Sequence, residues 1–93
     1  MSKKSLHVVN RLRELRRESG LTQAKLAEDL EVTRHTILAL EVGRYVPSIE
    51  LALQLAAYFQ IPLESIFWLE SEDGIQLPKG VLMEGRDGNA EKK

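Results

Sequence analysis

The chain has no cysteine, and this absence excludes several kinds of protein. Without cysteine there is no disulfide framework, no thiolate ligand for a metal and no cysteine nucleophile. No apolar run approaches the length of about 20 residues that spans a bilayer, and the N-terminal residues lack the apolar stretch of a secretory signal. We therefore expect a protein of the cytoplasm with no membrane partner.

The sequence also offers little for catalysis. Its two histidines, His7 and His35, fall in separate predicted helices, with neither metal-ligand spacing nor a paired nucleophile. There is no glycine-rich phosphate loop and no Walker-type motif. We expect a protein that is not an enzyme and that has no metal or cofactor.

Neither sign of charge dominates, since the net charge is −1. Taken alone, this value argues against a nucleic-acid partner. The distribution is uneven, however: residues 1–44 carry nine Lys or Arg and six Asp or Glu, whereas residues 45–93 carry four and eight. A basic face presented to phosphates and an acidic rear fit this asymmetry, and scattered solvated charge is the alternative.

Apolar residues recur at helical spacing between cap residues, and this pattern predicts a helical domain over residues 1–69. A single domain is what a chain of 93 residues can form. The first helix runs from about Ser5 to Ser19 and ends at Gly20. Thr22 and Thr33 cap the second and third helices. The second helix runs from Gln23 to about Leu30. The third is about eight residues long and ends at Glu41 and Gly43.

Ser48 caps a fourth helix, about Ile49 to Phe59. The side chains of this helix are apolar nearly all round its axis. It is therefore expected to be buried on more than one side, with the second side against a fifth helix or a second subunit. Pro62 suits the first turn of that fifth helix, which runs from Leu63 to about Trp68.

Residues 70–93 form a C-terminal extension of different character. An acidic break at 70–74 precedes Ile75–Leu77 and Val81–Met83, which can pair as a β-hairpin about Pro78-Lys79-Gly80. A disordered tail fits the same composition equally well, and a mobile tail is expected from Gly85 onward.

Residues 6–69 resemble the lambda-repressor/Cro-like, or xenobiotic-response-element-like (XRE), helix-turn-helix regulators of the short stand-alone type. The resemblance rests on the Leu-Thr-Gln opening of the second helix, the inward Ala27, the Ile-x-x-Leu-Glu of the third helix and the Gly-Arg-x-x-Pro-Ser link. It implies an all-α, five-helix, lambda-repressor-like DNA-binding domain. The function implied is a sequence-specific transcriptional regulator with its third helix in the major groove of double-stranded DNA.

The resemblance also implies roles for individual residues. Arg34, His35 and Thr36 would face base edges, because Arg can pair in bidentate fashion with guanine and Thr can meet thymine. Gln23 would contact a phosphate or a base. Arg16 and Glu41 match a structural ion pair that ties the first helix to the third. The full set of expected DNA contacts is Gln23, Lys25, Thr33, Arg34, His35, Thr36, Ala39 and Arg44.

Two positions depart from the family pattern. Glu31, in the turn between the second and third helices, replaces the usual Gly, and Gln60 replaces the usual Gly or Asn after the fourth helix. If both positions keep a left-handed backbone, each costs on the order of 1 kcal/mol.

One recognition helix reads only a few base pairs, so we expect a homodimer on a palindromic operator, with recognition helices about 34 Å apart. The expected dimer interface is Leu55, Tyr58, Phe67 and Trp68, extended by Ile75–Met83. The alternative is an antitoxin or transcriptional adaptor that uses the same fold to bind a protein partner, with the acidic extension as the binding segment.

Overall fold

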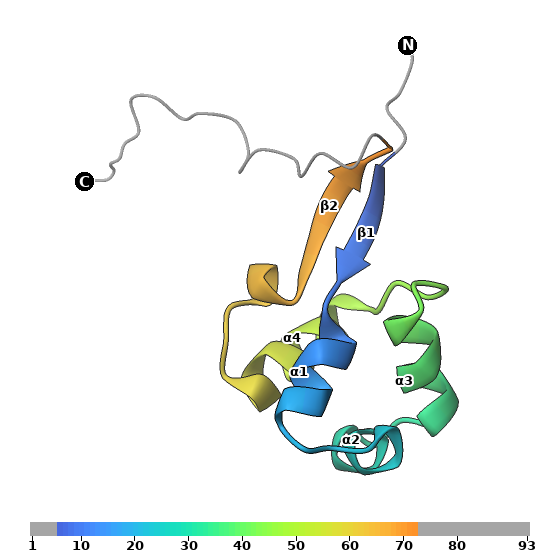
Figure 1. Ribbon diagram of the computed structural model, residues 1–93, viewed down its shortest axis with the longest axis vertical. Helices are drawn as coiled ribbons and strands as arrows, with labels where there is room; N and C mark the ends of the chain where they lie inside the picture. Colours follow the sequence, from blue (N-terminus) through green and yellow to red (C-terminus); the bar gives the residue numbers. More distant parts are fainter. Residues whose placement is uncertain (1–5, 73–93) are drawn as a thin grey trace, which may run out of the picture.

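A helical body carries a two-stranded β-ribbon in the computed structural model, which describes residues 6–72 (Figure 1). The ribbon stands away from the helices, at the end opposite α2. In chain order the elements are β1 (Leu6–Asn10), α1 (Leu12–Glu18), α2 (Gln23–Leu30), α3 (Arg34–Glu41), α4 (Ile49–Phe59), the 3₁₀ turn η1 (Leu63–Ser65) and β2 (Phe67–Ser71).

The first part of the expected first helix is a strand. β1 pairs antiparallel with β2, so that Val8 faces Leu69 and Val9 faces Trp68. Helix α1 begins only at Leu12, with Arg11 as its N-cap residue. Asn10, one residue earlier, accepts the Leu12 backbone N–H with its Oδ1 at 2.9 Å. The Val8-Val9 pair fits a strand because β-branched side chains pack well on a pleated surface.

The expected fifth helix is also corrected. After Pro62 the chain makes one 3₁₀ turn and then enters β2, which contains Phe67 and Trp68. Arg11 fixes this path, since its backbone N–H donates to the Ile66 carbonyl at 3.1 Å and its Nε donates to Ser65 at 2.7 Å. The all-α, five-helix prediction therefore gives way to four helices, a 3₁₀ turn and a two-stranded sheet within residues 6–72.

The remaining helices begin where their cap residues predict. Thr22, Thr33 and Ser48 each accept a backbone N–H from the residue three positions on. Glu31 and Gln60 both have left-handed backbones, with φ of 61° and 59°. The hairpin expected at 75–83 lies outside the described residues.

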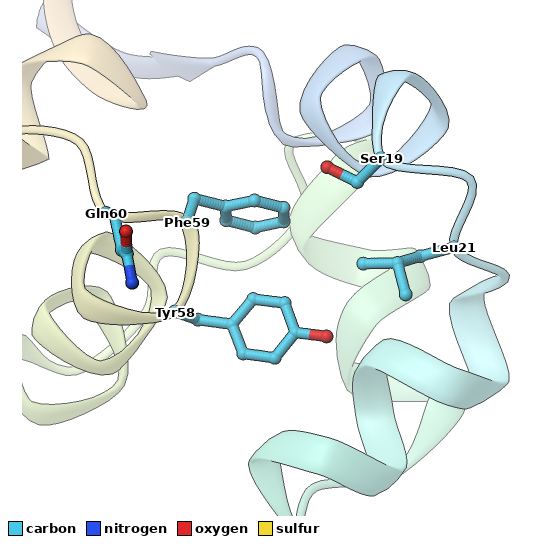
Figure 2. A pocket seen from close by; sticks show the side chains of 5 residues that line it. All are labelled: Ser19, Leu21, Tyr58, Phe59 and Gln60. Atoms are coloured by element: carbon cyan, nitrogen blue, oxygen red, sulfur yellow. The ribbon is translucent and has the colours of Figure 1, made fainter.

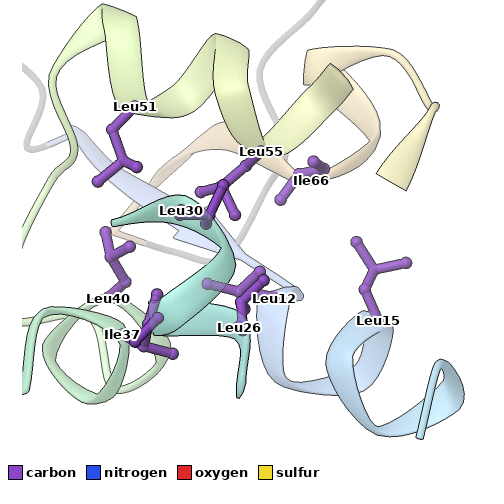
Figure 3. Close-up of a cluster of buried hydrophobic side chains, with 10 residues drawn as sticks. Leu12, Leu15, Leu26, Leu30, Ile37, Leu40, Leu51, Leu55 and Ile66 are labelled. Carbon is purple, nitrogen blue, oxygen red and sulfur yellow. The ribbon is translucent and has the colours of Figure 1, made fainter. Parts of the chain in front are cut away.

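The core lies between the four helices and the start of β2 (Figure 3). Ala27 is 3% exposed, which fits a close approach of α2 to its neighbours. Every helix contributes large side chains to the core. The large core side chains with no exposed surface are Leu12, Leu26, Ile37, Leu40 and Leu55 from the helices, and Ile66 from the residue between η1 and β2.

The expected dimer interface is wrong at Leu55, which is fully buried. Leu51 and Leu55 point from α4 into the core (Figure 3), so no partner could reach Leu55 without unfolding the chain. Helix α4 is nevertheless apolar on its other side, where Ile49 and Leu53 remain 72% and 54% exposed.

The other three residues of that expected interface are partly buried. Tyr58 and Phe59 meet edge to face beside an open surface hollow (Figure 2), and the Tyr58 hydroxyl donates to Asp29 at 2.7 Å. Phe67 packs against the core. On the ribbon, the Trp68 indole N–H donates to Glu70 at 3.0 Å.

Candidate nucleic-acid interface

Helices α2 and α3 form a helix-turn-helix around a three-residue turn, Glu31 to Thr33. The Thr22 hydroxyl caps α2 by accepting the Lys25 N–H at 3.0 Å. At the other end of α2, the left-handed Glu31 turns the chain, and the Val32 N–H donates back to the Ala27 carbonyl at 3.0 Å. These bonds fix the angle at which α3 leaves α2.

The N-terminal turn of α3 faces solvent. Thr33, Arg34 and His35 are exposed, and Thr36 is half-buried. The Thr33 hydroxyl accepts the Thr36 N–H at 3.1 Å and lies 3.0 Å from the Thr36 hydroxyl. Thr33 therefore serves first as the cap of α3, while Arg34 and His35 make no side-chain hydrogen bond or ion pair within the described chain.

A buried carboxylate at the end of α3 joins three helices. Glu41 Oε2 accepts from Arg16 Nε at 2.5 Å, and Oε1 accepts from Arg16 Nη2 at 3.2 Å. Oε1 also accepts from Gln23 Nε2 at 3.1 Å and lies 3.6 Å from Arg13 Nε. The Glu41 side chain has no exposed surface, and that of Arg16 is 10% exposed. We call Arg16, Gln23 and Glu41 the Glu41 cluster.

The Glu41 cluster keeps its carboxylate ionised despite its burial. Burial alone would raise the pKa of Glu41, but hydrogen bonds from Arg16 and Gln23, with the charges of Arg16 and Arg13, lower it below its ordinary value. The pKa of Arg16 is raised chiefly by its hydrogen bond to Glu41. The cluster is therefore an ion pair from α1 to α3 with a neutral amide from α2 bound to it.

The carboxylate also sets the direction of the Gln23 amide. An ionised carboxylate only accepts hydrogen bonds, so it selects the NH₂ end of the amide and leaves Gln23 Oε1 free to point elsewhere. One N–H and the carbonyl oxygen of Gln23 thus remain available to another molecule. The sequence predicts contact between Gln23 and DNA but does not reveal that α3 itself orients this side chain.

A surface hollow of about 420 Å³ joins this amide to the start of α3. Arg17 from the end of α1 and Arg34 from the start of α3 line it, beside Thr22 and Gln23 at the N-terminus of α2. Two exposed cations next to a helix N-terminus suit an anion such as a phosphate. Arg17 was missed as a candidate, because only the fold brings the end of α1 next to the start of α3.

The other expected contacts are spread more widely. Lys25 lies 3.2 Å from Asp29 in a largely exposed i,i+4 pair, in which the hydrogen bond to Asp29 raises the pKa of Lys25. Such a pair is weak enough for a phosphate to replace the carboxylate. Arg44 is exposed just beyond α3, and Ala39 is half-buried. These residues are not part of the hollow that Arg17 and Arg34 line.

Asn10 links the β-ribbon to the helices α1 and α3 by hydrogen bonds. Its Nδ2 donates to the Leu40 carbonyl at 2.9 Å while its Oδ1 accepts the Leu12 N–H, so one side chain joins the ribbon, the start of α1 and the end of α3. No group of His, Cys, Asp and Glu in residues 6–72 is arranged to hold a metal ion. None of the helices described is long and apolar enough to cross a membrane.

The chain is similar in sequence to several proteins that are named as transcriptional regulators. The family model described as "Helix-turn-helix domain" matches residues 9–72. A Bacillus subtilis protein named "Uncharacterized HTH-type transcriptional regulator YgzD" is 47% identical over 64 residues, which cover 69% of this chain and 97% of that protein. An "Uncharacterized HTH-type transcriptional regulator" of Methanothermobacter thermautotrophicus is 55% identical over 64 residues, covering 68% and 91%. A similarly named protein of Methanocaldococcus jannaschii is 42% identical over 64 residues, covering 69% and 97%.

Proposed function

Because the chain belongs to the helix-turn-helix domain family and is an XRE-like regulator, we propose that it recognises a specific sequence in double-stranded DNA through α3. The observation that carries this proposal is the Glu41 cluster. It holds one N–H of the half-buried Gln23 amide and leaves its other N–H and its oxygen free, in the hollow that the exposed Arg34 also lines. A side chain aimed by a buried carboxylate loses little conformational freedom when it binds, which favours a role in recognition.

The free groups match the edges of bases in the major groove. The remaining N–H and the oxygen of Gln23 are the donor and acceptor that pair with adenine N7 and N6. Arg34 offers the fork that pairs with guanine, and His35 and Thr36 complete the exposed turn. Ala39, further along α3, suits contact with a thymine methyl group.

Phosphates would bind around this centre. Arg17 lines the hollow at the N-terminus of α2, and Arg44 lies just past the end of α3. Lys25 can exchange Asp29 for a phosphate. Contacts of this kind fix the register of a protein on the duplex without reading its sequence.

Affinity for a defined site requires two such helices, so we propose a homodimer on a palindromic operator. The two recognition helices would lie about 34 Å apart, one turn of B-DNA. Each base pair read by a bidentate side chain contributes roughly 1–3 kcal/mol of discrimination.

Selection of bound duplexes from a random library tests the proposal. We expect enrichment of an inverted repeat and affinity that falls steeply with salt. Arg34→Lys is the matched variant, because it keeps the charge but not the bidentate fork. It should retain salt-dependent binding and lose preference at one position of each half-site. No enrichment and no salt-dependent binding by the native chain would instead favour the alternative of an antitoxin or adaptor that binds protein.

A further inference from the structure

Two neighbouring residues at the C-terminal end of α3 are bound by other elements. Leu40 is fully buried and its carbonyl accepts a hydrogen bond from Asn10 Nδ2 of the β-ribbon at 2.9 Å. The carboxylate of Glu41, the next residue, is held by the Glu41 cluster. At the start of α3, by contrast, the side chains that face solvent bond only within their own turn.

The surroundings of Asn10 decide which end of its amide faces α3. Its oxygen lies 2.9 Å from the Leu12 N–H, which can bind only an acceptor, and its nitrogen lies 2.9 Å from the Leu40 carbonyl, which can bind only a donor. That carbonyl is one of the last four of α3, which have no partner within the helix. The bond to Leu40 is therefore distinct from the bond at the start of α1.

The ribbon also fixes the backbone from which the Asn10 side chain extends. Asn10 pairs with Phe67 of β2, and Phe67 packs against the core. The next residue, Arg11, donates its backbone N–H to Ile66 and its Nε to the Ser65 carbonyl at 2.7 Å. A side chain that starts from a fixed backbone can hold its partner closely in place.

The direction of α3 depends on where its two ends lie. The turn from Glu31 to Thr33 places the start, and the bonds to Leu40 and Glu41 place the end. Arg34 and Leu40 are six residues apart, so about 9 Å of helix axis separates them. A shift of about 1.5 Å at Leu40 would tilt this axis by about 10° and move a side-chain tip about 6 Å from the axis by about 1 Å. Hydrogen-bond lengths vary by only about 0.5 Å.

We infer that Asn10 is a positioning residue for DNA recognition, through which the β-ribbon sets the direction of α3 and so the place of Arg34 against a base. The inference rests on the proposed function, and it assigns the ribbon a part in sequence recognition without contact with DNA. Loss of the bond from Asn10 to Leu40 should reduce the preference for the operator more than the affinity for DNA in general, because phosphate contacts tolerate a tilt better than base contacts do.

Two substitutions of Asn10 test the bond to Leu40. Asn10→Asp keeps the shape and an acceptor for the Leu12 N–H, but an ionised carboxylate cannot donate to a carbonyl. Asn10→Ser also keeps an acceptor, adds no charge, and is too short to reach Leu40. Arg11→Met is the matched control: it lowers the net charge by one, as Asn10→Asp does, and it loses a side-chain bond to the Ser65 carbonyl without touching α3.

Fluorescence anisotropy would measure the affinity of each variant for the selected operator and for a scrambled duplex at the same salt concentration. The ratio of the two affinities cancels the effect of net charge, which acts on both duplexes. We expect the ratio to fall about tenfold in both Asn10 variants, a part of the roughly 5- to 150-fold that one bidentate pair contributes. In Arg11→Met it should stay within about twofold of the native value. Thermal melts followed by circular dichroism verify folding, and Asn10→Ser alone decides if Asn10→Asp does not fold.

A double-mutant cycle separates positioning from a general loss of structure. Arg34→Lys already removes the bidentate fork that α3 must align. Adding Asn10→Ser to Arg34→Lys should therefore lower the ratio by much less than the about tenfold expected for Asn10→Ser alone.

Three outcomes would overturn the inference: an unchanged ratio in a folded Asn10 variant, an equal fall in Arg11→Met, or the full fall from Asn10→Ser in the Arg34→Lys background. In all three the native chain still prefers its operator, so the proposed function stands. A native chain that binds both duplexes equally, or neither, refutes the proposed function and this inference with it.

Discussion

Arg16 holds one end of a buried ion pair, and its loss would leave Glu41 as a carboxylate with no exposed surface. Removing one partner of such a pair typically costs about 3–5 kcal/mol. Arg13, at 3.6 Å, and Gln23 compensate in part. We therefore expect Arg16→Met to lower the free energy of unfolding in urea by about 3 kcal/mol. A change below about 1 kcal/mol would mean that the pair contributes little to stability.

Glu41, the other partner of this ion pair, predicts how stability depends on pH. The pKa of Glu41 is lower in the folded chain than its ordinary value of 4.5, so its stabilisation is complete above about pH 4.5 and is lost as the pH falls through the folded value. Urea titrations should give a flat free energy of unfolding from pH 7 to about pH 5 and a decline below that. Glu41→Gln should weaken the decline more than Asp29→Asn, whose carboxyl is more exposed.

Gln23 allows recognition to be separated from stability. Its neutral amide donates one of the three hydrogen bonds to the buried Glu41 carboxylate, so Gln23→Ala should lower the free energy of unfolding by about 1–2 kcal/mol, less than Arg16→Met does, and leave the chain folded. It should lower affinity for the selected operator by about 1–3 kcal/mol, with loss of preference at one base pair of each half-site. Fluorescence anisotropy with single-base operator variants measures this. Equal losses on all sequences would show that Gln23 contacts phosphate instead of a base.

Among the elements, the turn between α2 and α3 has an unfavourable backbone. Glu31 has φ of 61°, a conformation that glycine adopts without steric cost. Glu31→Gly should raise the free energy of unfolding by up to about 1 kcal/mol and raise the thermal midpoint. Gln60→Gly, with φ of 59° after α4, should behave in the same way. An unchanged or lower midpoint in both variants would mean that side-chain contacts outweigh the strain.

The elements also show what the sequence can and cannot predict. Helices α2, α3 and α4 could be placed because Thr22, Thr33 and Ser48 act within three residues of themselves. The β-ribbon could not, since its two strands are five residues each and pair across a separation of nearly the whole domain. Val8 and Val9 satisfy helical spacing as well as a strand, and only their partners Leu69 and Trp68 decide between the two.

Prediction of the candidate site is limited in the same way. The Arg16–Glu41 pair could be anticipated from the resemblance, and the exposure of Arg34 and His35 from helical periodicity. The bond from Gln23 to Glu41 and the approach of Arg17 to Arg34 depend on how three helices cross. Leu55 was assigned to a surface because the apolar pattern of α4 does not show which side meets the core.

At the scale of the whole molecule, DNA binding must be reconciled with a net charge of −1. Four cations lie on or beside the helix-turn-helix, namely Arg17, Lys25, Arg34 and Arg44. DNA binding would therefore depend on these few side chains and not on a strongly basic surface. Because Arg34 is assigned to a base, about three phosphate contacts remain per subunit, and the slope of log K against log salt should be about −3. Titrations of a duplex with one half-site between about 50 and 200 mM salt measure this slope.

The most direct test of the account is base preference at the position that Gln23 reads. Duplexes selected from a random library by the native chain and by Gln23→Ala would be sequenced side by side. We predict an inverted repeat with both proteins, in which one adenine·thymine pair per half-site is fixed for the native chain and variable for Gln23→Ala. The same repeat with the same base preferences from both proteins, or no enrichment by the native chain, would contradict it.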